Sequence, residues 1–421
     1  MAFPPSRKGH AKAGQPLQPG DTPLTASHST ASTAWRATAT VSSYYALFGC
    51  FIPWLSRWMA DVGGFSGEQI GLVITLSGLS RIVLGPLLSA WADGRSDRRT
   101  PIVVLGIVTL LAFSAMAAGL GISVNFALVF LTQVTVWSLI AFLEAALIRL
   151  TGKDTGPAYG FARGLASAAF VVGNVAVGLL VDALGPWAIL GWLLATAALM
   201  IASGFLMTPE PQTRETGAPF AQRLSDGLAM LKRPEFALLA FGAGLIQGAH
   251  QYYYVFSTLL WRDQGFDGTT IGWLWALGVI AEVLFLMFLA RHTERWSPAL
   301  LILAGGLGSL VRWTGLAMEP GLAGLIPLQI LHCASFAFTF LGTMRGIQLL
   351  YGDDRAPTAQ MIYQSLANAP AAAGATYVAG LLYGAGLGAE GYLGMSAIAG
   401  VGTLLALLLV MRRRALAPTP S

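Results

Sequence analysis

Long apolar stretches recur along the whole chain and are separated by short polar or Gly- and Pro-containing turns. Residues 186–207 and 393–411 carry no charged side chain, and each stretch is long enough to cross a hydrocarbon core of about 30 Å as a helix. Twelve comparable stretches occupy residues 37–60, 67–92, 101–120, 124–150, 158–183, 186–208, 235–261, 268–292, 298–317, 321–350, 357–385 and 389–411. The pattern predicts an all-α membrane protein with twelve transmembrane helices.

The composition agrees with a chain surrounded by lipid. Charged residues make up 11 % of the chain, against roughly 25 % in a soluble domain, and the mean hydropathy is +0.64. Cys50 and Cys333 lie in apolar stretches of opposite halves, which is typical of small buried residues. The net charge of +5 does not indicate nucleic-acid binding, because the basic residues follow a different pattern.

Lys and Arg are distributed unequally between the two sets of connections. When the spans are numbered with the N-terminus inside, 21 of the 25 basic residues fall on that side, whereas only Arg57 and Arg262 fall on the other. Basic residues gather in cytoplasmic connections of membrane proteins. We therefore expect a multi-pass protein of the bacterial inner membrane with both termini in the cytoplasm.

The polar segments divide the chain into parts. Residues 1–34 are rich in Pro, Ser and Thr and contain no apolar core of a signal peptide, so we expect a disordered cytoplasmic tail. The longest internal connection then separates two six-helix bundles. The predicted parts after the tail are a first bundle at 35–208, a cytoplasmic linker at 209–234, a second bundle at 235–411 and a C-terminal tail at 412–421.

The two predicted bundles share a sequence pattern. Phe-x-Gly-x-x-Ile-Gly opens span two at Phe65 and span eight at Phe266, an offset of 201 residues. A match at equivalent positions of two six-helix halves indicates a duplication with pseudo-twofold symmetry. Duplicated transporters of this kind bind their substrate near the bilayer midplane, between the repeats.

Several short motifs lie in the second half. They are Gln-x-x-His at 247–250, Ala-Glu-Val at 281–283, Val-Arg-Trp at 311–313 and Gln-Ile-Leu-His at 329–332. Together they resemble the phenylpropionate permease family of the major facilitator superfamily, a group of lactose-permease-like proton symporters. The resemblance implies the major facilitator fold, a small organic substrate, and a central cavity lined by spans one, four, seven and ten.

Ionisable residues lie deep inside five predicted spans. An ionised side chain at the bilayer centre costs at least ~2.5–3.5 kcal/mol, so such residues usually face a cavity or a partner and have a function. Arg81 and Glu282 occupy equivalent positions of the two halves, where they meet directly, share a network or form a purely structural pair. The five residues are Arg81, His250, Glu282, Arg312 and His332.

Spacing and resemblance together select the candidate site. Gln247, His250 and Tyr254 recur at helical intervals on span seven, and Gln329 and His332 repeat those intervals on span ten. The alternative is that these groups are buried for structural reasons. We predict substrate binding by Arg81, Gln247, His250, Tyr254, Gln329 and Tyr45, and proton coupling by Glu282, His332 and Arg312.

The connection after span two resembles the cytoplasmic signature of the superfamily, an acidic residue followed by basic residues. Asp93, Arg98 and Arg99 carry this pattern, with an altered spacing, and we predict that they gate the inner side. Ordinary basic anchoring accounts for the two arginines alone, but it does not account for Asp93.

These features favour a secondary transporter over an enzyme. The sequence shows no metal-ligand cluster, no nucleophile with a base at catalytic spacing and no phosphate-binding loop, so we expect no cofactor and no bound metal. We predict proton-coupled uptake of an aromatic carboxylate such as a phenylpropionate, by alternating access, in a monomer. The alternatives are a sugar or nucleoside symporter and a drug efflux antiporter.

Overall fold

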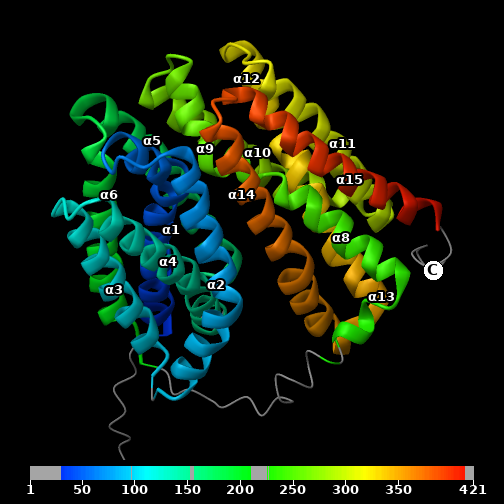
Figure 1. Cartoon of the computed structure of the whole chain (residues 1–421). Coiled ribbons are helices and arrows are strands. Elements are labelled where there is room, and N and C mark those ends of the chain that lie inside the picture. Colours follow the sequence, from blue (N-terminus) through cyan, green and yellow to red (C-terminus); the bar gives the residue numbers. More distant parts are fainter. Residues whose placement is uncertain (1–29, 96, 152–155, 210–224, 226, 413–421) are drawn as a thin grey trace, which may run out of the picture.

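The computed structural model describes residues 30–95, 97–151, 156–209, 225 and 227–412. Its regular elements are helices, arranged as two halves that stand side by side (Figure 1). The predicted C-terminal tail lies almost entirely outside these ranges, as do most of the linker and residues 1–29 of the N-terminal tail. The first helix begins at Thr30, before the predicted end of that tail.

The first half contains six helices, each of which corresponds to one predicted span. They are α1 (Thr30–Asp61), α2 (Gly67–Asp93), α3 (Arg99–Ala117), α4 (Ile122–Leu150), α5 (Tyr159–Leu184) and α6 (Trp187–Leu206).

The second half is built from shorter pieces, because π-helical and 3₁₀ turns interrupt its helices. They are α8 (Pro234–Gly248), α9 (Gln251–Asp263), α10 (Gly268–Leu284), η1 (Phe285–Leu289), η2 (Ala290–Thr293), α11 (Pro298–Ala317), α12 (Leu322–Ile330), η3 (Cys333–Phe338), α13 (Thr339–Ile362), η4 (Tyr363–Asn368), α14 (Ala369–Gly384), η5 (Gly388–Glu390) and α15 (Gly391–Met411).

The predicted number of spans is confirmed. Among the described residues, nine helical segments are long and apolar enough to cross a membrane. One of them, Leu322–Gly384, contains two spans, because the chain reverses at Gly352, whose φ of 64° lies in the left-handed region that glycine tolerates. The 32-residue α1 is a further span, and α8 with α9 completes the twelve across a break at Ala249 and His250.

The two halves touch through glycines at one end, which we call the closed end. On α2 and α14, a Cβ at Gly71 would lie 2.5 Å from Gly380 Cα. On α5 and α10, a Cβ at Gly178 would lie 2.2 Å from the Gly268 carbonyl oxygen. Only hydrogen fits at such distances, so glycine allows the helix backbones to approach closely here.

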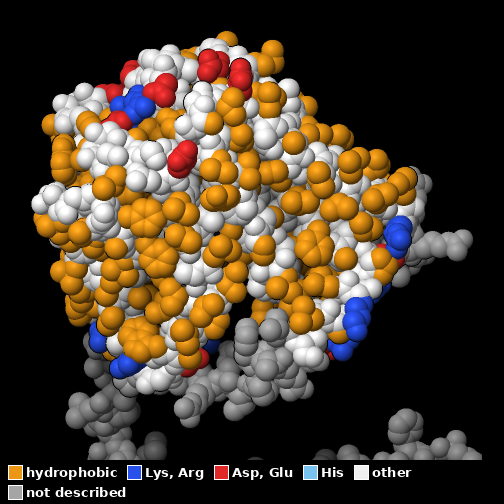
Figure 2. Space-filling view, viewed as in Figure 1, with side chains coloured by type: hydrophobic (Ala, Val, Ile, Leu, Met, Phe, Trp, Pro, Cys, Tyr) orange, Lys and Arg blue, Asp and Glu red, His pale blue; other side chains and the backbone are white. Residues whose placement is uncertain are grey.

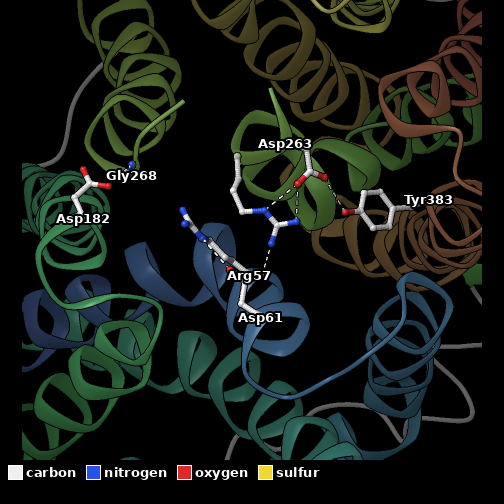
Figure 3. A network of polar contacts seen from close by, with 7 residues as sticks. Arg57, Asp61, Asp182, Asp263, Gly268 and Tyr383 are labelled. Carbon is white, nitrogen blue, oxygen red and sulfur yellow. Dashed lines mark hydrogen bonds and ion pairs between the residues drawn. The ribbon is translucent and has the colours of Figure 1, made fainter. Parts of the chain in front are cut away.

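Polar contacts reinforce the closed end (Figure 3). Asp182 of α5 accepts hydrogen bonds from the Gly268 N–H at 2.6 Å, the Thr269 N–H at 2.8 Å and the Thr269 hydroxyl at 2.6 Å. It thereby caps the start of α10 in the other half, where helical N–H groups lack partners.

A second set of contacts lies beside it. Arg262 of α9 forms ion pairs with Asp61 of α1 and with Asp263, and the Tyr383 hydroxyl donates to Asp263 at 3.4 Å. This set also links the two halves, since Asp61 belongs to the first and Arg262 to the second.

The outer surface is suited to lipid. Apolar side chains cover most of the face seen in Figure 2. Large apolar side chains exposed on the surface of the molecule include Val83, Leu87 and Leu404. Acidic side chains gather near the closed end in this view and basic ones at the opposite end. This distribution agrees with the predicted orientation, in which the closed end faces outward; the orientation itself stays a prediction.

Candidate functional site

A central cavity of about 470 Å³ lies between the two halves. Aromatic side chains from both halves contribute to its wall, including Tyr45, Phe48, Trp137, Phe170, Tyr254 and Trp275. Two charged side chains also line it, Arg163 from α5 and Glu282 from α10. The cavity therefore combines ring surfaces for stacking with charged groups from opposite halves.

A lateral cavity of about 960 Å³ adjoins it, between α2 and the segment formed by η4 and α14. The two helices contact each other at Gly67, Gly71 and Thr75, and the lateral cavity separates them farther from the closed end. Arg81 lines this cavity. Both cavities share the side chains of Ile74, Gln133, Trp137, Gln251 and Asn368, which we call the neck.

The three residues predicted to couple protons form a chain of contacts. Arg312 Nη1 lies 3.0 Å from His332 Nδ1, and His332 Nε2 lies 3.7 Å from Glu282 Oε2. Because arginine is always a donor, Nδ1 must accept, and a neutral His332 carries its hydrogen on Nε2, facing Glu282. Glu282 and His332 both line the central cavity, whereas Arg312 is fully buried behind them.

Neutral groups surround Arg312. Its Nε donates to the Leu328 carbonyl at 3.0 Å and its Nη2 donates to Gln329 Oε1 at 3.2 Å. Its guanidinium also lies 4.3 Å from the centre of the Tyr253 ring and 4.6 Å from that of Trp313. Within the described ranges, no carboxylate forms an ion pair with Arg312, so its positive charge is uncompensated.

Gln329 lies in this buried layer rather than in the cavity wall. Its Oε1 accepts from Arg312 and from the Tyr253 hydroxyl, the latter at 2.9 Å. Gln329 therefore contacts Arg312 and lines neither cavity, and substrate binding by Gln329 stays a prediction.

His250 and Gln247 also lie away from both cavities. His250 Nδ1 is 3.1 Å from the Ile246 carbonyl oxygen and Nε2 is 3.1 Å from Ser335 Oγ, so the ring links span seven to span ten. Gln247 Nε2 donates to the Phe336 carbonyl at 3.3 Å. Gln247, His250 and Tyr254 were predicted to share one face of span seven, but the break between α8 and α9 interrupts that span. Of these three residues, only Tyr254 lines the central cavity.

Arg81 and Glu282, at equivalent positions of the two halves, line different cavities. The structure gives no ion pair between them among the described residues. The Arg81 guanidinium instead lies 4.8 Å from the centre of the Trp137 ring, and its buried Nε has no hydrogen-bond partner in the described part of the chain.

The structure contains an ion pair in the first half that the sequence did not predict. Arg163 Nε lies 3.2 Å from Glu144 Oε1, which also accepts from the Tyr45 hydroxyl at 3.0 Å. The Tyr159 hydroxyl donates to the other oxygen at 3.1 Å. Arg163 is one of the 21 basic residues that were assigned to the cytoplasmic side. Its position inside the apolar stretch 158–183 was a signal that it faces a cavity.

The predicted gating residues lie at the opposite end from the closed end. Asp93 ends α2 and Arg98 precedes α3. Arg99 Nε lies 3.2 Å from Asp97 Oδ2, and its Nη1 donates to the Phe205 carbonyl at 3.1 Å. These contacts of Arg99 are within the first half, and the gating role stays a prediction.

Known proteins resemble this chain over most of its length. The model of the MFS_1 like family matches residues 35–391. A probable 3-phenylpropionic acid transporter of Escherichia coli is 31 % identical over 338 residues, which cover 80 % of this chain and 87 % of that protein. A maltose permease of Geobacillus stearothermophilus is 26 % identical over 374 residues, covering 87 % of this chain and 92 % of the permease.

Solved structures extend the likeness to the fold. The crystal structure of the nucleoside transporter NupG superposes with a TM-score of 0.76 at 15 % identity, over 91 % of this chain and 99 % of that one. The family match and the first relative show the family. The chain therefore belongs to the MFS_1 like family of major facilitator transporters, and it is a multi-pass membrane transporter rather than an enzyme.

Proposed function

We propose that this transporter couples the uptake of a small aromatic carboxylate to the entry of a proton, by alternating access. The supporting observation is the charge balance of the cavity walls. Arg163 is compensated by Glu144, which leaves Arg81 as the uncompensated cation among the described cavity-lining residues. Glu282 is the acid that lines the central cavity.

This balance makes the proton and the anion depend on each other. When Glu282 is ionised, it supplies a negative charge to the region that holds Arg81 and Arg312, and an entering anion adds a second one to a desolvated space. When Glu282 is protonated, that region has an excess of positive charge, and Arg81 at the cavity wall attracts an anion. A monoanion and a proton therefore bind most favourably together, and they leave together.

His332 and Arg312 set the properties of the proton site. Arg312 keeps the Nδ1 of His332 in the acceptor role, so the Nε2 hydrogen faces Glu282 across 3.7 Å. A modest closure of the cavity makes this contact a hydrogen bond, which favours the ionised carboxylate and releases the proton. Protonation of Glu282 is thereby coupled to the relative positions of the helices that carry Glu282 and His332.

The contacts between the halves support an assignment of the described state to one step of the proposed cycle. Contacts between the halves concentrate at the closed end, while the lateral cavity lies farther along α2. With the predicted orientation in the inner membrane, with both termini in the cytoplasm, this is an inward-facing state. The aromatic residues of the cavity wall favour a substrate that contains an aromatic ring. The 3-phenylpropionic acid in the name of the Escherichia coli relative contains such a ring. The proposed transporting unit is a monomer, since both cavities lie within one chain.

The test is uptake of labelled 3-phenylpropionate into proteoliposomes, with and without an imposed inward proton gradient. The wild-type protein accumulates the label only with the gradient. Glu282→Gln removes the titratable group, so gradient-driven accumulation is lost while exchange of internal for external substrate continues. Full accumulation by Glu282→Gln would remove this residue from the mechanism.

A sugar or nucleoside is the second candidate, and one observation favours it. Tyr45 and Arg163 line the central cavity and contact Glu144, which also accepts from Tyr159. Their polar groups are suited to the hydroxyl groups of such a substrate. Excess maltose or uridine that displaces labelled 3-phenylpropionate would support this candidate. Net export of the label from energised vesicles would instead support an efflux antiporter.

A further inference from the structure

Two side chains of α4 line the neck between the cavities, one helical turn apart. Trp137 Nε1 donates a hydrogen bond to Gln133 Oε1 at 3.1 Å. An indole N–H is only a donor, so this contact fixes the orientation of the Gln133 amide, with its oxygen toward Trp137 and its NH₂ group directed elsewhere. Gln133 is 6 % exposed and lines both cavities, and its NH₂ group forms no hydrogen bond within the part of the chain that the structure describes but stays accessible there.

The same indole also holds a cation. The Arg81 guanidinium lies 4.8 Å from the centre of the Trp137 ring, and Arg81 Nε is buried without a hydrogen-bond partner in the described ranges. Phe48 packs edge-on against Trp137 with ring centres 5.0 Å apart, which fixes the indole in turn. One rigid ring thus places two unsatisfied donor groups, one charged and one neutral, beside the neck.

The other arginines near the cavities do not offer such donors. Arg163 is engaged by Glu144 and lies over the Tyr45 ring at 4.5 Å. Arg312 lines neither cavity and donates to Leu328, Gln329 and His332. The buried Arg81 Nε, without a partner among the described residues, costs free energy, and the Gln133 side chain beside it lines both cavities. A ligand that accepts from both groups explains why the site keeps them.

Resting on the proposed function, we propose that Arg81 and Gln133 form the seat for the carboxylate of the substrate, with Trp137 as their positioning residue. A planar carboxylate accepts from the guanidinium through one oxygen or both, and the Gln133 NH₂ group donates to it as well. The substrate ring occupies the central cavity. The seat takes a monocarboxylate carried on an apolar body, and a neutral molecule of the same shape gains nothing from it.

The experiment compares an acid with its neutral counterpart on purified full-length protein. Calorimetric titration measures the Kd of 3-phenylpropionate and of 3-phenylpropan-1-ol. The ratio of the two Kd values measures the contribution of the carboxylate to binding at the seat. Gln133→Leu weakens binding of the acid about tenfold or more, which is the loss expected for a hydrogen bond to a charged group, and leaves the alcohol unchanged. Arg81→Gln weakens the acid at least about thirtyfold.

A matched control separates the seat from general damage. Gln364 also lines the lateral cavity, but it belongs to η4, and its Oε1 accepts from Asn368 at 2.9 Å. Gln364→Leu therefore keeps the wild-type ratio of the two Kd values. If Arg81→Gln does not fold, Gln133→Leu decides the question alone.

A double-mutant cycle tests the role of Trp137. Trp137→Phe keeps an aromatic face for Arg81 but removes the N–H that orients Gln133, so the acid binds more weakly and the alcohol does not. Trp137→Phe combined with Gln133→Leu is no weaker for the acid than Gln133→Leu alone, because both changes disable the same donor. Additive losses would overturn the positioning role.

The outcomes distinguish the seat from the proposed function. Wild-type binding and gradient-driven uptake of the acid, together with unchanged ratios in Gln133→Leu and Arg81→Gln, would overturn the seat and leave the function standing. Wild-type protein that neither binds nor transports 3-phenylpropionate would overturn both.

Discussion

Arg312 donates to the Nδ1 atom of His332 at 3.0 Å, and this one contact decides which face of the histidine presents a hydrogen to Glu282. A buried cation thereby acts on the cavity without lining it. The carboxylate at the end of this chain of contacts responds to both the cavity and the layer behind it.

The first prediction concerns His332. His332→Gln keeps an oxygen that accepts from Arg312 and an NH₂ group that faces Glu282, so it retains part of the gradient-driven uptake. His332→Phe leaves a buried donor of Arg312 without a partner, which costs about 1–3 kcal/mol of folding free energy. Uptake in proteoliposomes and thermal unfolding in detergent measure the two effects. Equal loss in both variants would show that the acceptor at this position is irrelevant.

The second prediction concerns the membrane potential. One proton that enters with one monoanion carries no net charge, so an imposed potassium diffusion potential leaves the uptake of 3-phenylpropionate unchanged at constant pH gradient. Each additional proton would add about 2.3 kcal/mol of driving force per 100 mV. Accumulation that rises with an inside-negative potential would contradict the charge balance of Arg81 and Glu282.

The third prediction uses two aspartates that cap the same helix. Asp182 caps α10 from the opposite half, whereas Asp267 accepts from the Thr270 N–H at 2.7 Å within its own half. Asp182→Ala weakens the closed end, and a loss of only about 1 kcal/mol increases its opening about fivefold. Asp267→Ala removes a cap of similar kind without affecting the contact between the halves.

The measurement for this pair is thiol labelling. A cysteine at Leu55, which lines the central cavity, is introduced after Cys50 and Cys333 are replaced by alanine. An impermeant maleimide added from the side of the closed end then labels the Asp182→Ala protein several times faster than the Asp267→Ala protein. Equal rates would exclude Asp182 from holding the halves together.

The fourth prediction compares two glycines of α2. A methyl group at Gly71 would lie 2.5 Å from Gly380 Cα, whereas a methyl group at Gly85 would have no atom of another described element within 4 Å. Gly71→Ala therefore separates α2 from α14 at the closed end and slows the return of empty carrier to this state. Gly85→Ala is neutral or slightly stabilising, because alanine favours the helix. Exchange and net uptake rates measure the difference, and equal behaviour of the two variants would contradict the close packing.

The sequence predicted the architecture better than the site, for physical reasons. Hydrophobic thickness sets the length of a span, so the apolar stretches located the helices, and the turn at Gly352 separates the spans predicted on either side of it. The break at Ala249 and His250 falls inside the stretch 235–261, which was predicted as one continuous span. The prediction assumed a continuous helix, and it therefore placed Gln247 and His250 on the face that lines the cavity.

The sequence also could not predict which charged residues form ion pairs with each other. Glu144 and Arg163 lie on different helices, and only the packing of α4 against α5 reveals that they compensate each other. Arg81 and Arg312 are equally conspicuous as isolated cations in apolar stretches. The structure separates them, because one lines a cavity and the other is enclosed by Tyr253 and Trp313.

The capping of α10 by Asp182 bears on how fast the protein can work. A carrier that sealed its two halves with a large apolar interface would rest in one state and turn over slowly. Here the carboxylate is near the rim, where solvent takes over its three hydrogen bonds as soon as the helices part. These hydrogen bonds are directional, yet they contribute only about 1 kcal/mol to the closed end, so in the proposed cycle one bound substrate and one proton are enough to shift the balance between its states.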